Sequence, residues 1–159
     1  MNQVSTRDRV QDFHARYIRC IDTDCLEHWP GFFAEDCRYS VTTAENRREG
    51  LGAGLIWANS RAMLHDRVTA LRHANIYERQ SYRHILGLPC ILSQDDDGGQ
   101  AVCETPFLVA RIVQGDTTSL FATGVYHDVF DLRQPPLLLR SRIVVCDSSR
   151  IDTLLAVPL

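Results

Sequence analysis

The sequence predicts one α+β domain in which helices come first and a curved antiparallel sheet follows. Apolar residues recur at helical spacing before residue 75, and from Ser81 onward the apolar period changes to two. With 159 residues, 45% apolar and 23% charged, the chain has ordinary globular composition and enough length for a single core spanning residues 1–159. Long strands that wrap the preceding helices would give the domain the shape of a cone.

The N-terminal segment predicts two helices. Ser5 with Asp8 resembles a capping box, and the apolar positions between residues 10 and 21 recur on one helical face. The first helix should therefore run to about Asp22. A second, short helix capped by Asp24 should follow and be interrupted at Pro30.

A strand, a loop and a third helix come next. Apolar and polar residues alternate over residues 37–43, which is typical of a half-buried strand. The polar run at residues 45–50, with the glycines that follow it, predicts a loop. An apolar stripe over residues 63–71 predicts the third helix, with Asn59 or Ser60 as its cap.

Four strands should form an antiparallel meander, at residues 81–94, 100–114, 117–132 and 137–147. In the last of these, simple alternation points leucines and β-branched residues one way and Arg140 and Arg142 the other. The two arginines should then meet solvent or a partner. Pro106 removes a ladder donor, so a bulge or a local edge is expected there.

Charge and hydropathy exclude several classes of protein. The net charge is -3, and no basic stripe follows the chain, so a nucleic-acid partner is not expected. No apolar stretch approaches the roughly 20 residues of a membrane span. The first ten residues are polar where a signal peptide would need an apolar centre, so a cytoplasmic protein is expected.

Metal-ligand spacing is missing from the sequence. The six cysteines include no C-x-x-C pair, and Cys25 with His28 supplies only half of the two-Cys, two-His set that a Rieske cluster needs. Four histidines lack the close pairing of a helical metal site: His65, His73, His84 and His127. No metal or cofactor is therefore expected in this chain.

An acid–base pocket is an alternative interpretation. Inward positions of a cone could bring Tyr39, His84, Tyr126 and Asp128 together, and such groups can perform isomerase or dehydratase chemistry. Isolated polar residues without a supporting motif more often serve structure, so a structural role is favoured.

Charged, aromatic and amide residues are dense where the third helix meets the following strand. This composition fits a solvated face, and it also fits an interface. The interface candidates are Arg67, Arg72, Asn75, Tyr77, Tyr82, Arg83 and His84. Trp29 is a further anchor candidate, for which a role in the core is equally compatible with the sequence.

These segments resemble the small, or β, subunits of aromatic-ring-hydroxylating dioxygenases. The matching motifs are W-P-x-F-F-x-E-D-C-R-Y at residues 29–39, M-L-x-D-R-V-x-A-L-R at 63–72, A-N-I-Y-E-R at 74–79, Y-R-H at 82–84 and V-C-D at 145–147. They occur in the expected order along most of the chain.

The resemblance implies a cone-shaped fold of the nuclear-transport-factor and cystatin-like, or SnoaL-like, type. It also implies a hexamer of three α and three β subunits about a three-fold axis, served indirectly by a reductase. The Rieske [2Fe-2S] cluster and the mononuclear Fe(II) would belong to the α subunit. No family-wide catalytic residue is carried over to this chain. The interface candidates would then contact the α subunit, and the free-standing isomerase or dehydratase remains the alternative.

Overall fold

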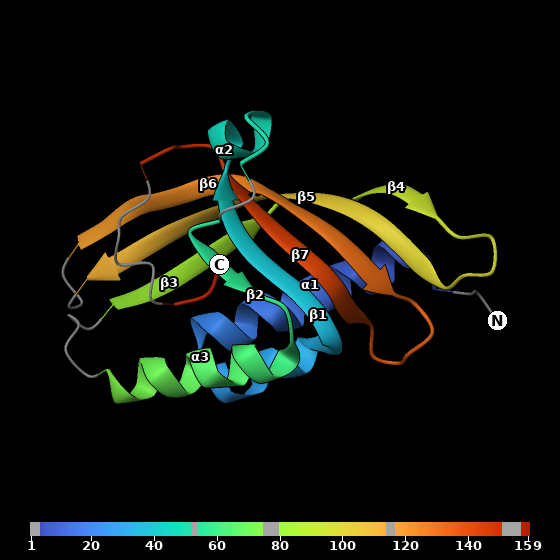
Figure 1. The fold of residues 1–159 in the computed structure, drawn as a ribbon, viewed down its shortest axis with the longest axis horizontal. Helices are drawn as coiled ribbons and strands as arrows, with labels where there is room; N and C mark the ends of the chain where they lie inside the picture. Colours follow the sequence, from blue (N-terminus) through green and yellow to red (C-terminus); the bar gives the residue numbers. More distant parts are fainter. Residues whose placement is uncertain (1–3, 52–53, 75–79, 114–116, 151–156) are drawn as a thin grey trace.

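A curved sheet arches over two helices in the computed structural model of the chain (Figure 1). The structure describes residues 4–51, 54–74, 80–113, 117–150 and 157–159. Helices α1 (Thr6–Asp22) and α3 (Arg61–His73) lie under the arch, whereas α2 (Ala44–Arg48) lies at the end of β1 (Phe33–Thr43), away from them (Figure 1). Among the described helices, none has the length and apolarity that a membrane crossing requires. This arrangement confirms the predicted α+β cone.

Helices α1 and α3 begin where their caps predict, but the expected Asp24 cap of the short helix after α1 is wrong, because that helix begins after Cys25 with no side-chain cap. Helix α1 spans Thr6–Asp22, and the Ser5 side chain accepts a hydrogen bond from the Asp8 amide. Helix α3 spans Arg61–His73, with Ser60 as its cap. The short helix between them, η1, is a 3-10 helix over Leu26–Phe32 that contains Pro30 rather than ending before it.

The strands form one seven-stranded sheet in the order β2-β1-β7-β6-β5-β3, with β4 also paired to β5. Their bounds are β1 Phe33–Thr43, β2 Ile56–Ala58, β3 Gln80–Leu86, β4 Cys90–Gln94, β5 Gln100–Val113, β6 Thr117–Asp131 and β7 Leu138–Cys146. The last three form the predicted meander.

Two expectations about the sheet were wrong. Strand β1 returns beside β7 in parallel, so the sheet is not wholly antiparallel. This pairing closes the sheet around the helices and could not be seen in a local pattern. The segment predicted as a loop contains helix α2, Ala44–Arg48, capped by Thr43, and the chain then returns to pair β2 with β1.

Pro106 explains why the strand predicted at residues 81–94 is two strands. Strands β3 and β4 both pair with β5, on either side of Pro106. Since proline has no amide hydrogen, the ladder is interrupted opposite it, and the amide of Gly87 donates to the Pro106 carbonyl at 2.8 Å. The predicted local edge is confirmed.

The core fills the concave side of the sheet with aromatic rings from four elements. Phe13 packs edge-to-face on Phe130 with ring centroids 5.0 Å apart, and Trp29 packs on Tyr39 at 5.2 Å. Leu159, the last residue of the sequence, is wholly buried with them. In Figure 1 the end of the chain lies beneath the arch.

Candidate functional site

A bulge in β7 decides which arginine enters the cone. Both neighbouring strands pair with Leu139 and then with Ser141, so Arg140 is skipped in each ladder. A one-residue slip reverses the facing of every later side chain. Arg142 therefore points into the core with 0% exposure, and the expectation that it meets solvent or a partner was wrong.

Arg142 is held by a carboxylate and two aromatic rings, although its other Nη has no hydrogen-bond partner among the described residues. Its Nε and one Nη donate to the two oxygens of Asp128, each at 2.8 Å. The guanidinium carbon lies 4.0 Å from the ring centroid of Tyr126 and 4.3 Å from that of Tyr17. Although burial disfavours its charge, the Asp128 carboxylate raises the pKa of Arg142 above its usual value. The ion pair is thus built into the core.

His14 joins this cluster as a neutral ring. Its Nδ1 accepts from Arg142 at 3.2 Å, which assigns the hydrogen to Nε2, and Nε2 donates to the Thr105 hydroxyl at 3.0 Å. Burial, and then the nearby Arg142 charge, lower the pKa of His14 to about 2. The ring therefore serves as a hydrogen-bonding spacer between α1 and the sheet.

This donor set does not fit a metal ion. The only carboxylate of the cluster, Asp128, has both oxygens engaged by Arg142, whose positive charge would oppose a cation. Over the described ranges, no three His, Cys, Asp or Glu side chains gather as a metal site needs.

The residues of the alternative acid–base pocket are all buried; three of them hydrogen-bond to different groups, and the Tyr126 hydroxyl has no hydrogen-bond partner among the described residues. The Tyr39 hydroxyl donates to the Leu159 carbonyl at 3.3 Å and accepts from its amide at 3.2 Å. His84 binds Asp22 through Nδ1 at 2.6 Å. Asp128 binds Arg142, so the groups do not converge on one reacting position.

At the end of α3, where charged and aromatic residues are dense in the sequence, Arg72 forms ion pairs within the chain. Arg72 donates to Glu27 at 2.7 Å and to Asp24 at 2.8 Å, and these bonds fasten α3 to η1 and to the turn before it. The hydrogen bond from Arg72 lowers the pKa of Glu27 to about 2. Arg72 therefore has carboxylate partners within its own chain.

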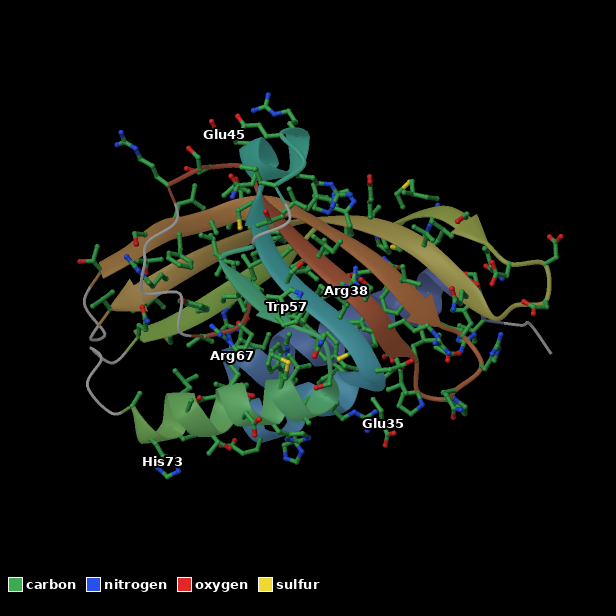
Figure 2. The ribbon with its side chains drawn as sticks, viewed as in Figure 1. Glu35, Arg38, Glu45, Trp57, Arg67 and His73 are labelled. Atoms are coloured by element: carbon green, nitrogen blue, oxygen red, sulfur yellow. The ribbon has the colours of Figure 1, made fainter. Side chains whose placement is uncertain are left out.

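The other interface candidates are dispersed. The side chain of Trp29 is wholly buried and donates to the Tyr17 hydroxyl, so it belongs to the core. Tyr82 and His84 are also buried. Arg67 is half-buried and extends from α3 toward the sheet (Figure 2). Arg83 is exposed, 3.9 Å from Asp22. Asn75 and Tyr77 lie outside the described residues.

A pocket on the outer face of the sheet was missed by the sequence reasoning. It is lined by residues of β1, β2, β7 and the α2 turn: Arg38, Ser40, Thr42, Arg47, Gly50, Leu51, Gly54, Trp57 and Ile143. The alternation in β1 already placed Arg38, Ser40 and Thr42 on the face opposite the core. No pattern in the sequence indicated that residues of α2 and β2 would line the same pocket.

Known proteins share this architecture and sequence. A profile of the SnoaL-like domain matches residues 2–142. The chain is 52% identical over 151 residues, which is 95% of this chain and 97% of the relative, to the terephthalate 1,2-dioxygenase terminal oxygenase component subunit beta 2 of Comamonas sp..

Solved structures of related proteins have the same fold. A chain described as the beta subunit of an aromatic-ring-hydroxylating dioxygenase from Novosphingobium aromaticivorans superposes with a TM-score of 0.88 at 38% identity, covering 96% of each chain. An NTF2-like protein with a cystatin-like fold from the same species gives a TM-score of 0.65 at 18% identity, covering 96% of this chain and 89% of that one. This second likeness confirms the fold. The chain belongs to the β subunits of aromatic-ring-hydroxylating dioxygenases, within the SnoaL-like family.

Proposed function

We propose that this chain is the non-catalytic β subunit of the terminal oxygenase of a terephthalate 1,2-dioxygenase. The 52% identity to the Comamonas subunit over 95% of the chain is the observation that carries the proposal. In the complex, terephthalate, O2, NADH and a proton would give the cis-dihydrodiol dicarboxylate and NAD+. The substrate would be selected by the α subunit.

The interior of the cone supports a structural role. In a free-standing acid–base enzyme, we would expect a carboxylate or imidazole to be available to a substrate. Here Asp128 is bound on both oxygens by Arg142, and the Tyr39 hydroxyl is bound by Leu159. These polar groups hold α1, the sheet and the end of the chain to one another, which gives a rigid body suited to assembly.

The expected assembly contains three α and three β subunits about a three-fold axis, in the cytoplasm. The Rieske [2Fe-2S] cluster and the mononuclear Fe(II) would lie in the α subunit, with electrons arriving from NADH through a reductase. Each β subunit would contribute surface and rigidity, with no ligand to either metal.

Co-expression tests this proposal. We expect this chain with the large subunit of a terephthalate 1,2-dioxygenase to form a hexamer by light scattering after size exclusion. With reductase and NADH, the hexamer should consume terephthalate and leave benzoate, the monocarboxylate control, largely untouched. The chain alone should contain no iron. One equivalent of tightly held iron in the lone chain, or turnover without a companion chain, would contradict the proposal.

A further inference from the structure

The outer-face pocket is a defined concavity of about 310 Å³. The strand register places Trp57, Ser40 and Ile143 in one row across β2, β1 and β7. Trp57 and Arg38 lie close together on this face in Figure 2. The pocket therefore rests on three adjacent strands.

Two arginines give the pocket a positive charge, and no carboxylate of the described residues is paired with either of them. Arg38 comes from β1 and Arg47 from α2, and both side chains are exposed. Within the ranges the structure describes, neither forms an ion pair or hydrogen bond with a carboxylate. After burial, the charge of Arg47 is the next cause that lowers the pKa of His127, so Arg47 acts over this face of the sheet. Planar guanidinium groups bind carboxylates with two parallel hydrogen bonds.

The rim of the pocket is apolar and exposed. Trp57 is 54% exposed, and Leu51 and Leu55 on the same segment are 54% and 53% exposed. Tryptophan and arginine beside exposed aliphatic side chains are the composition of interface hot spots. A small free anion would use the arginines but would leave most of this apolar surface in water.

Residues 54–57, which include Leu55 and Trp57, are fixed to β1. The Leu55 amide donates to the Val41 carbonyl at 2.7 Å, and a Cβ at Gly54 would come within 2.7 Å of the same oxygen. Only glycine allows this close approach. Leu55 and Trp57 are thus held in place before any partner binds, which lowers the entropic cost of association.

We propose that this pocket receives a carboxylate-bearing segment of the large oxygenase subunit, with an apolar side chain of that segment covering Trp57. This inference rests on the proposed function, because it names where the partner binds. Charge favours the large subunit over a second copy that meets this one through the same pocket, since that contact would place Arg38 and Arg47 of the two copies against one another.

Matched variants of the co-expressed complex test the site. Arg38→Ala with Arg47→Ala, and separately Trp57→Ala, should each weaken the complex at least about tenfold, as measured by dissociation on dilution. Arg48→Ala is the control for charge, because Arg48 is exposed on α2 but does not line the pocket. Leu120→Ala is the apolar control, because Leu120 is 65% exposed on β6. All four variants should keep the urea midpoint of the lone chain.

Fluorine NMR reports on the pocket directly. The chain has two tryptophans, of which Trp29 is wholly buried and Trp57 is half exposed. After labelling this chain alone with 5-fluorotryptophan, addition of the unlabelled large subunit should shift the Trp57 resonance and reduce its solvent isotope effect. The Trp29 resonance is the internal control and should stay in place.

The outcomes separate this site from the proposed function. If a wild-type hexamer forms and all variants match it, the docking site is wrong and the proposed function stands. If no hexamer forms with the wild-type chain, the proposed function itself is contradicted. If the variants change only self-association of the lone chain, the occupant is a second copy and the assignment to the large subunit fails. The assignment would fail equally if benzoate bound to the pocket of the lone chain and the variants left the stability of the complex unchanged.

Discussion

The two faces of the sheet place arginine side chains in opposite environments. On the inner face, Arg142 has two hydrogen bonds to Asp128, a neutral histidine and two aromatic rings around it. On the outer face, Arg38 on the adjacent strand is exposed and has no carboxylate partner in the described part of the chain. On the inner face the charge of Arg142 is neutralised within the chain, whereas the outer face presents a charge that a second chain could neutralise.

This comparison predicts its largest effect at Arg142. Arg142→Met should lower the free energy of unfolding by about 3–5 kcal/mol, because Asp128 would be left buried and unpaired. Arg38→Met on the outer face is the matched control and should change stability by less than about 0.5 kcal/mol. Urea unfolding of the lone chains measures both. Equal effects of the two changes would show that the faces do not differ.

A pair of buried tyrosines sharpens the comparison inside the core. Tyr39→Phe should cost about 1–3 kcal/mol, because the Leu159 amide would lose its acceptor. Tyr126→Phe should be close to neutral, because the Tyr126 hydroxyl has no hydrogen-bond partner among the described residues. Thermal and urea unfolding of the two variants should rank them in this order. The reverse ranking would mean that Leu159 is not held by Tyr39.

The lowered pKa of His14 predicts how the free energy of unfolding depends on pH. The folded pKa of about 2 lies below the unfolded value of 6.5, so the unfolded chain binds the proton first. The contribution of His14 is therefore fully present above pH 6.5 and declines as the pH falls toward 2, by about 1.4 kcal/mol per pH unit.

Substitution isolates that contribution. The stability difference between the wild type and His14→Asn should shrink by about 1.4 kcal/mol between pH 6 and pH 5. His28→Asn, at an exposed histidine, is the control and should leave the pH profile unchanged. A constant difference between the wild type and His14→Asn across this range would show that His14 is protonated in the folded chain.

The smallest effect is expected at the exposed corner. Arg72→Ala should lower the stability of the lone chain by less than about 1 kcal/mol, since its bonds to Asp24 and Glu27 are largely in water. The loss should diminish in 1 M NaCl. If Arg72→Ala instead leaves the chain unchanged and weakens the hexamer, the corner is a second contact with the large subunit.

Local patterns in the sequence predicted much of the fold. The caps at Ser5 and Ser60, the interruption at Pro106 and the three long strands all follow from chemistry within a few residues. The motif-bearing segments also identified the family. The candidate interface residues were less predictable, because spacing alone does not separate Trp29, which is buried, from Trp57, which is exposed.

What the sequence determined by itself was therefore where helices and most strands begin and end, because caps, periodicity and proline act over a turn or a few residues. The tertiary structure decided the parallel β1–β7 pairing and the facing of Arg142. Both depend on register between strands that are distant in the sequence. Because side chains alternate every residue, the single bulge at Arg140 was enough to move a charge from the surface into the core.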